Sequence, residues 1–591
     1  MSSSGSSSHQ SLLRFLARYK WRYLLGVVAL TGTDFFQLVT PRLIGLFVDD
    51  LEAGRLDRPG IYRYLALIVG TALLVAFLRF VWRIFVFGTA RLVERDLRAD
   101  LFAHLVRLPA SFFHRHKTGD LMAMATNDLQ AVRGIAGEGV LMVADSLAMT
   151  ILTLVAMVST IGLRLSLWAL LPLPALALLI AVVGRAIFAR SRAVQDSFAH
   201  LSEVVQENIE GVRVVKAYNQ EAAEEAKFDR ANRDYIRRFM ALMRIDGLFD
   251  PVVNLFAGLC YVVAIAIPGR AVLRGEISVG DFASLTIYIG MLIWPMIAMG
   301  WVVHIIQRGF AGFARIREVL LTEPEVKDAP VTVTPPDGKI RGEIDIRDLT
   351  FRYDPDGPPV LDGINLHVAP GQTLGILGRT GSGKSTLAAL LARVFNPPRG
   401  TVFIDGIDVL DLPLELLRRS IAAVPQESFL FSRTVAENIG FAPGDWTEEQ
   451  IRQAARTAQV EQDILEFLPH GYETMVGERG VTLSGGQRQR VGLSRALLKN
   501  APILVLDDCL SAVDTATEQR ILNGLRPVMR ERTTIIISHR VAAVKDADQI
   551  IVLERGRIAE AGTHEELLAL RGRYFRTYQR QQLEEAIASL D

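Results

Sequence analysis

A glycine-rich stretch in the second half of the chain has the residue pattern with the most specific chemistry. The apolar run TLGIL at 373–377 leads into GRTGSGKS, and apolar residues at helical spacing follow. This is G-x-x-x-x-G-K-[ST] in the strand, loop and helix context that it requires, which disfavours a chance glycine-rich turn. Glycines let backbone N–H groups surround phosphate oxygens, while the helix N-terminus and a lysine add positive charge. We therefore expect a nucleoside triphosphate site formed by Gly378, Arg379, Thr380, Gly381, Ser382, Gly383, Lys384, Ser385 and Thr386.

Two adjacent carboxylates, Asp507 and Asp508, follow a second apolar strand, ILVL at 503–506. A P-loop fold places an acid beside Mg²⁺ at the end of such a strand, so we expect Asp507 to bind the metal together with the Ser385 hydroxyl. Asp508 would point at the water that attacks the γ-phosphate. The predicted ligands are thus a nucleoside triphosphate and Mg²⁺. Asp508 is open to three interpretations: a working base, a weakened base or a helix-capping residue.

The composition divides the 591-residue chain into an apolar first half and a second half typical of a soluble α/β protein. Hydrophobic residues make up 50% of the whole, and the formal net charge of +1 gives no indication of a nucleic-acid partner. Two cysteines exclude a disulfide scaffold and a cysteine-built zinc site. Cys509 could be reactive, but a buried inert thiol is the favoured interpretation.

Six apolar segments are long enough to span a bilayer, which takes about 20 residues each. An even number of spans puts both termini on one side. The connections 88–138 and 187–249 are rich in Arg and Lys, so the positive-inside tendency places them and both termini in the cytoplasm. A tight turn is predicted around Arg164. The predicted spans lie near 21–46, 61–87, 139–163, 165–186, 250–270 and 280–304.

The long connections are predicted to be helical arms rather than loose loops. Leu97, Leu101 and Leu105 recur at helical spacing past the second span, and Pro109 then breaks the helix. Aromatic residues follow at the tips, Phe112 and Phe113 in one connection and Tyr218 in the other. Such tips would dock on another part of the protein; packing of one arm on the other is the alternative.

The remaining segments complete the predicted domain organisation. Residues 1–20 combine a Ser-rich disordered tail with an amphipathic interfacial helix, and the Pro-rich, charged stretch 321–341 is a linker. The predicted domains are a six-helix transmembrane domain over 21–320, an α/β nucleotide-binding domain over 342–580 and a C-terminal tail over 581–591. Asp34, in the middle of the first span, either forms an ion pair with Arg79 or lines a polar cavity.

The stretch LSGGQRQR at 483–490, just before the paired carboxylates, resembles the signature motif of ABC transporters. Further elements follow the family's order: Tyr353, Gln426 in AVPQESFLF, VGERG at 476–480, SAVD at 511–514 and His539 in IIISHR. The resemblance covers nearly the whole chain, because six spans with intracellular arms ahead of this domain are the exporter half-transporter arrangement. The expected fold is an all-α six-helix transmembrane domain followed by an α/β P-loop ABC ATPase domain.

The resemblance implies a role for each matched residue. Tyr353 would stack on adenine, Gln426 would contact Mg²⁺ and the membrane domain, and His539 would contact the γ-phosphate. In the family two nucleotide domains close head to tail on two ATPs, so a second half-transporter is implied. Asp514 would lie at the dimer seam, and closure would move the docked arms. The residues that would act on the partner's ATP are Ser484, Gly485, Gly486 and Gln487.

Asp508 departs from the family, which usually has glutamate at this position as the presumed base. Aspartate is one methylene shorter, about 1.5 Å of reach, and loss of a general base typically costs about 10²–10⁴-fold. This chain therefore resembles the degenerate-site subunit of bacterial heterodimeric multidrug exporters, with its intact signature serving a competent partner site. The alternative is a homodimer in which aspartate works slowly.

The favoured function is an ATP-driven exporter of amphipathic or lipophilic compounds, a multi-pass protein of a cell membrane, with a bacterial inner membrane expected. A lipid or peptide translocator and an ABC-type gating or regulatory membrane protein are the alternatives. A soluble P-loop ATPase acting on DNA or the ribosome would share the signature, but the six apolar spans disfavour it. An importer is disfavoured because importers usually carry their membrane and ATPase parts on separate chains.

Overall fold

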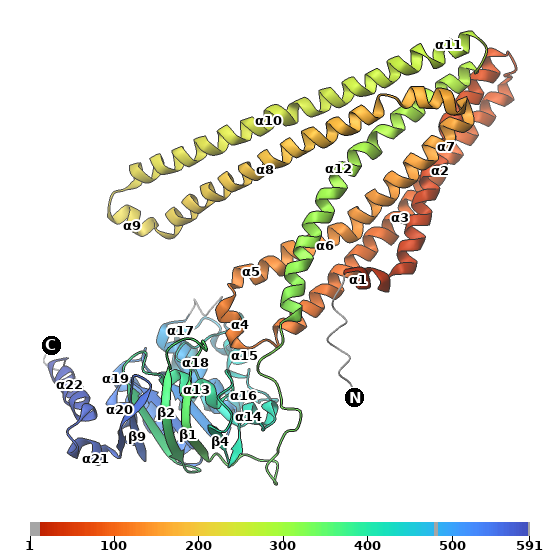
Figure 1. Ribbon diagram of the computed structural model, residues 1–591. Coiled ribbons are helices and arrows are strands. Elements are labelled where there is room, and N and C mark those ends of the chain that lie inside the picture. The colour runs from red at the N-terminus through yellow and green to blue at the C-terminus, as the bar shows by residue number, and fades with distance from the viewer. Residues whose placement is uncertain (1–11, 478–482, 589–591) are drawn as a thin grey trace. The chain divides into compact units, whose positions relative to one another are not determined.

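The computed structural model describes residues 12–477 and 483–588, which form two compact units (Figure 1). The first unit runs to Val106 and continues over Lys117–Thr322, and the second comprises Arg107–His116 and Glu323–Asp591. The predicted Ser-rich tail lies outside the described residues. So do residues 478–480 of the predicted VGERG element.

The first unit is entirely helical among its described residues. Two π-helical turns, Met124–Asp128 and Ile135–Gly139, connect three of its helices into one continuous segment. Among the described residues, five segments are long and apolar enough to cross a membrane, one fewer than predicted: Lys20–Glu52, Arg58–Leu105, Thr118–Leu170, Glu221–Leu273 and Val279–Leu321. Most of the predicted span 165–186 lies outside them. The helices are α1 (Leu12–Arg18), α2 (Lys20–Glu52), α3 (Arg58–Leu105), α5 (Thr118–Ala123), α6 (Leu129–Gly134), α7 (Val140–Leu170), α8 (Leu173–Glu210), α9 (Val212–Ala217), α10 (Glu221–Ala266), α11 (Pro268–Leu273) and α12 (Val279–Leu321).

The helix is broken two residues before the turn predicted around Arg164. Gly162 has a φ of 77° and a ψ of 162°, outside the helical region, so α7 consists of two helical pieces that meet at this kink. A second break follows, because α7 ends at Leu170 and α8 begins at Leu173. Pro172 caps α8 and Pro174 lies in its first turn, where a proline loses no helical hydrogen bond.

Helical arms continue the spans, as the leucine spacing predicted. α3 runs on to Leu105, and Pro109 precedes the short helix α4 (Ala110–Arg115). α8 and α10 lie side by side along their length, with α9 joining their far ends (Figure 1). Polar bonds link these two helices near the tip, from Asn208 to Glu224 at 2.8 Å and from Lys227 to Glu207 at 2.7 Å.

α2 and α12 approach each other closely at a pair of glycines. A Cβ atom on Gly280 would lie 1.9 Å from the carbonyl oxygen of Gly45, so only glycine fits there. Asp49 on α2 accepts hydrogen bonds from Ser278 Oγ and Gly280 N, both at 2.7 Å, and so caps the start of α12. This contact joins the first and last of the five apolar segments.

Asp34 is buried on α2, and its environment bears on the two interpretations of its charge. Arg79 donates to Gln37 Oε1 at 3.1 Å, and no ion pair between Asp34 and Arg79 occurs among the described residues. Asp34 Oδ2 has no hydrogen-bond partner there either. The described contacts thus do not support the ion-pair interpretation.

The second unit contains two sheets. A four-stranded antiparallel sheet has the order β2-β1-β4-β5, and a six-stranded sheet has the order β10-β9-β3-β8-β7-β6, in which only β10 is antiparallel to its neighbour. β7 and β8 are buried throughout, as expected for central parallel strands covered on both faces. The strands are β1 (Ile344–Phe351), β2 (Leu361–Val368), β3 (Thr373–Gly378), β4 (Val402–Ile404), β5 (Ile407–Asp408), β6 (Ile421–Val424), β7 (Ile503–Asp507), β8 (Thr533–Ser538), β9 (Gln549–Glu554) and β10 (Arg557–Gly562).

Short helices connect these strands, and the last one extends past the predicted end of the domain. α22 runs without interruption through Ala588, across the residues predicted as a tail. The helices are α13 (Lys384–Leu391), α14 (Leu414–Arg419), α15 (Val435–Ile439), α16 (Glu448–Thr457), α17 (Glu461–Phe467), α18 (Gly485–Leu498), α19 (Thr515–Arg530), α20 (Val541–Val544), α21 (His564–Ala569) and α22 (Arg573–Ala588).

Strand register brings the predicted site residues to one edge of the six-stranded sheet. Leu377 pairs with Ser538, Leu506 with Ile536, and Val424 with Leu506. The P-loop, His539, the paired carboxylates and Gln426 each follow the end of a parallel strand, and parallel strands end at the same edge.

Candidate functional site

The P-loop between β3 and α13 has the backbone geometry of a phosphate cradle. Gly381 and Gly383 have φ values of 80° and 100°, a region that side chains rarely adopt. A Cβ on Gly383 would lie 2.8 Å from Val360 O, and one on Gly378 would lie 2.7 Å from Ser382 Oγ. Glycine is therefore required at both ends of the loop, where backbone N–H groups can turn inward.

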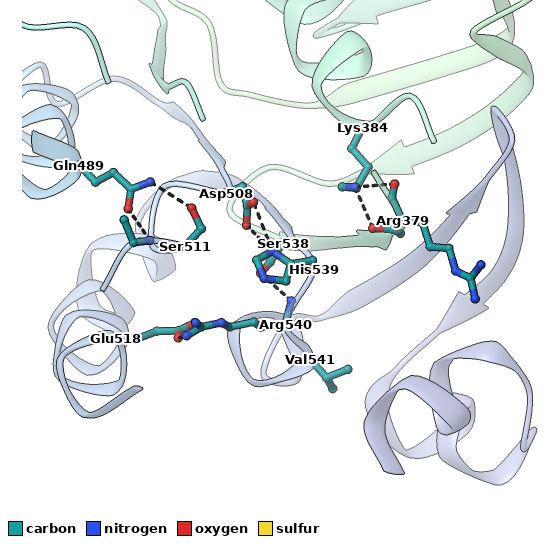
Figure 2. Close-up of polar contacts among 12 residues, drawn as sticks. Arg379, Lys384, Gln489, Asp508, Ser511, Glu518, Ser538, His539, Arg540 and Val541 are labelled. Atoms are coloured by element: carbon teal, nitrogen blue, oxygen red, sulfur yellow. Dashed lines mark hydrogen bonds and ion pairs between the residues drawn. The ribbon is translucent and has the colours of Figure 1, made fainter. Parts of the chain in front are cut away.

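Lys384 lies at the start of α13 and reaches back over the loop. Its Nζ donates to the carbonyl oxygens of Gly378 at 2.8 Å and Arg379 at 3.0 Å (Figure 2). Burial lowers the pKa of Lys384, while the charges of Asp508 and Asp507 oppose that shift. A half-buried ammonium between carbonyls and carboxylates is held where an anionic phosphate would complete its charge balance.

Ser382 supplies an independent test of whether the loop fits a nucleotide. Its Oγ is buried and has no hydrogen-bond partner among the described residues. Buried hydroxyls are normally paired, so this atom and the inward N–H groups match the chemistry of phosphate oxygens. The residues present therefore fit a bound triphosphate.

Asp507 ends β7 and is buried beside the P-loop helix. Burial raises its pKa, the charge of Asp508 adds to that shift, and a hydrogen bond with Ser385 and the charge of Lys384 oppose it. A buried carboxylate beside a serine hydroxyl is a ligand pair suited to Mg²⁺. Gln426, exposed just past β6, is at the same sheet edge.

Asp508 turns away from the strand and pairs with His539. Its φ is 45°, and its backbone N–H donates to Ile537 O at 2.9 Å. The two carboxylate oxygens lie 3.0 and 3.2 Å from His539 Nδ1 (Figure 2). The interpretation as a helix cap does not fit, because the helix that follows, α19, is capped by Asp514.

Tyr353 presents an exposed ring beside the P-loop helix. Its hydroxyl lies 2.9 Å from Thr386 Oγ1, and its ring packs edge-on against Phe395 with centroids 5.1 Å apart. These contacts fix the ring while leaving part of it open, as stacking on a base requires. Phe395 also lies 5.9 Å from the ring of His114 in α4.

The signature residues begin α18 and pack against the loop that precedes α19. Ser484 caps α18 in a reciprocal box with Gln487, and a Cβ on Gly486 would lie 3.0 Å from Ala512 O. Asp514 accepts from Thr517 N at 2.9 Å and caps α19. These contacts fix the signature end of α18 against the predicted seam loop of the same chain.

The predicted coupling residues differ in exposure. Phe112 is 5% exposed and Phe113 is half-buried, in a helix whose Ser111 and Arg115 bond to Glu325 at 2.9 and 3.3 Å. Tyr218, beyond α9, is 73% exposed. The structure thus gives α4 contacts within the second unit, while the tip at Tyr218 is uncovered.

Sequence reasoning missed three polar links around the site. Gln489 donates to Ser511 Oγ at 3.1 Å and accepts from Ala512 N at 3.0 Å, and Glu518 forms a buried ion pair with Arg540 (Figure 2). Gln581 bonds to the backbone on both sides of Arg540. Gln489 lies inside the quoted signature, but nothing in the sequence pairs it with Ser511.

Two family models match this chain. Residues 23–296 match the family described as the ABC transporter transmembrane region, and residues 361–511 match the family described as ABC transporter. The multidrug resistance-like ATP-binding protein MdlA of Escherichia coli is 41% identical over 576 residues, 97% of each chain. The chain belongs to the ABC transporter family.

Other relatives agree with this assignment. The probable multidrug resistance ABC transporter ATP-binding/permease protein YheI of Bacillus subtilis is 39% identical, over 96% of this chain and 97% of that one. An ATP-dependent lipid A-core flippase of Nitrosococcus oceani is 36% identical, over 98% and 96%. The structure of a bacterial Atm1-family ABC exporter with ATP bound superposes with a TM-score of 0.78 at 28% identity, over 96% and 98%.

This ABC transporter is of the exporter type, with fused transmembrane and ATP-binding domains. The predicted family and fold class are confirmed. The chain is a multi-pass membrane protein, and its ABC ATPase domain drives transport.

Proposed function

We propose that the chain is one half of an asymmetric exporter, in which Asp508 makes the ATP site on this chain's P-loop weak. The observation that carries this proposal is the contact of the Asp508 carboxylate with His539 Nδ1. A base must reach the attacking water, and this shorter side chain is already engaged with the histidine. ATP would bind well at Lys384 and the P-loop but turn over slowly.

The partner is a second half-transporter with its own glutamate base. This chain's Ser484, Gly485, Gly486 and Gln487 would act on the partner's ATP, and Asp514 would lie at the seam. Mg²⁺ would be held by Ser385, Asp507 and Gln426, where it neutralises phosphate charge during transfer. His539 would contact the γ-phosphate, and Tyr353 the adenine.

The contacts of α4 support its role in coupling. Ser111 and Arg115 bond to Glu325, and His114 adjoins Phe395, which packs on Tyr353. A conformational change at the nucleotide site would thus be transmitted to α4 through these packed side chains. Phe112 and Phe113 would transmit closure to this chain's membrane helices, and the exposed Tyr218 would dock on the partner.

A cavity of about 790 Å³ in the first unit supports an amphipathic cargo. Arg91, Arg133 and Arg308 line it together with Asn127, Gln130 and one acid, Glu138, next to apolar helices. A lining with more basic than acidic side chains beside a membrane favours compounds with an apolar body and an acidic group. This observation also favours the second candidate, a homodimeric lipid translocator, as the similarity to lipid A-core flippases suggests.

The deciding experiment is the intact mass of the complex, purified from its natural source with gentle solubilisation. Two different chains in equal amount are expected. A complex of this 65.3 kDa chain alone, at twice its mass, would make Asp508 the base of both sites and contradict the asymmetry. Both termini are proposed to lie in the cytoplasm, beneath a bacterial inner membrane.

Transport itself is tested by reconstituting the complex in vesicles. Acidic amphiphiles are expected to move on addition of ATP and to raise ATP turnover. ATP-dependent permeability without accumulation against a gradient would instead indicate a gate.

A further inference from the structure

The C-terminal helix α22 presents one face to the nucleotide-binding unit. Tyr574, Tyr578 and Gln581 are spaced four and three residues apart, which puts them on one side of the helix. Tyr574 is fully buried, its backbone N–H donates to Glu560 Oε2 at 3.0 Å, and its hydroxyl lies 2.6 Å from His564 Nδ1. α22 is therefore anchored on β10 and α21 before it reaches Gln581.

Gln581 makes two hydrogen bonds to the segment that follows β8. Its Nε2 donates to His539 O at 2.8 Å, and its Oε1 accepts from Val541 N at 2.8 Å. One side-chain amide thus satisfies backbone groups on both sides of Arg540. These groups lie between the end of β8 and the start of α20, where no strand pairing holds them.

The segment 539–541 is fixed from two directions. On one side the buried Glu518 of α19 holds the partly exposed Arg540 side chain in an ion pair, and on the other Gln581 holds the backbone. The His539 ring itself is half exposed, and Asp508 is its polar contact. Its position therefore depends on how firmly its backbone is held.

We propose that Gln581 is a positioning residue that places His539 against the γ-phosphate of ATP. The inference rests on the proposed contact of His539 with that phosphate. Through Gln581, the helix α22, which follows the last strand, would help this chain's site to distinguish ATP from ADP.

The test is the ratio of ATP to ADP affinity at this chain's site, measured by equilibrium binding to the purified complex. Gln581→Met keeps the length of the side chain but removes both hydrogen bonds. We expect the ratio to fall about fivefold, in line with the net contribution of one ordinary hydrogen bond. Gln582→Met is the matched control, because among the described residues the Gln582 side chain bonds only to Tyr578 OH within α22, and it should leave the ratio unchanged.

Two further variants separate this inference from the proposed function. His539→Ala should lower the ratio by about tenfold, since it removes a hydrogen bond to a charged group. In the double variant with Gln581→Met the ratio should fall no further, because both substitutions act through the same contact. ADP affinity should stay at the wild-type level in all of them, which also shows that the unit is folded.

Each other outcome contradicts a specific step. If His539→Ala lowers the ratio and Gln581→Met does not, Gln581 has no positioning role. If Gln581→Met weakens ATP and ADP equally, α22 is only a structural support. If His539→Ala leaves the ratio unchanged, the proposed γ-phosphate contact fails, and this inference fails with it.

Discussion

Asp508 shows how one methylene group can decide the role of a catalytic position. Its left-handed backbone is tolerated by aspartate better than by most residues, and from there the carboxylate reaches His539. The position at the end of β7 was predictable from the sequence, since an apolar strand ending in an acid is specific. The histidine contact was not, because it depends on how β7 and β8 pair.

Asp508→Glu is expected to raise single-site ATP turnover at this chain's site by about 10²-fold or more, because the longer side chain can reach the attacking water. Turnover by this site alone is measured in a complex whose partner site is inactivated. Asp546→Glu, at a surface ion pair with Arg526, is the control and should change nothing. An unaltered rate would show that another residue limits hydrolysis.

Lys384→Ala should weaken ATP binding at the same site by about tenfold or more, since it removes a half-buried positive charge from the loop proposed to hold the phosphates. Labelled-ATP binding to this chain measures the effect. Lys339→Ala, an exposed lysine before β1, should leave binding intact. Equal binding by the two variants would refute the P-loop assignment.

At the level of helices, the sequence predicted the existence of elements better than their ends. Apolar runs and the leucine spacing identified the spans and the arm formed by α3. The turn predicted near Arg164 corresponds to the kink at Gly162, whereas the second break, at Pro172 and Pro174 where α8 begins, was not predicted. The Gly45–Gly280 contact could not be predicted, since it depends on which helix faces which.

Gly280→Ala is expected to lower the free energy of unfolding by about 1–3 kcal/mol, because the added methyl group overlaps the Gly45 carbonyl. Thermal unfolding in lipid or detergent measures it. Gly70→Ala on α3 is the control, since nothing lies within 4 Å of the position of its added Cβ. Equal melting of both variants would mean that α2 and α12 do not approach this closely.

Combined Phe112→Ala and Phe113→Ala should uncouple ATP hydrolysis from transport while leaving ATP binding intact. The buried Phe112 anchors α4, so its loss frees the helix from the second unit without touching the P-loop. Transport and ATP turnover are compared in the same vesicles. Val106→Ala, an exposed apolar residue nearby, is the control; normal transport by the double variant would remove the docking argument.

At the scale of the whole molecule, the cavity in the first unit is the proposed site for the cargo. Arg133 forms an ion pair with the buried Glu94 at 3.2 Å. Arg308 lines the same cavity from α12 without an ion pair among the described residues. The sequence showed basic residues near the spans but not which of them share a cavity. Arg308 is thus the arginine best placed to meet an acidic cargo.

Arg308→Ala should reduce the stimulation of ATP turnover by acidic amphiphiles several-fold. It should leave unstimulated turnover unchanged, because Arg308 belongs to the first unit and the P-loop to the second. Arg317→Ala, exposed on the same helix but outside the cavity lining, is the control. The same stimulation in both variants would exclude the cavity as the cargo site.

The Asp49 and Gly280 contact also has a consequence for biogenesis. Ser278 follows Asp49 by 229 residues, so at about 5–20 residues per second the ribosome needs roughly 10–45 s to supply it. During that interval the Gly45 face of the newly inserted first helix has no partner, and the Asp49 carboxylate caps nothing. The nascent chain is therefore most exposed to quality control before its last membrane helix emerges.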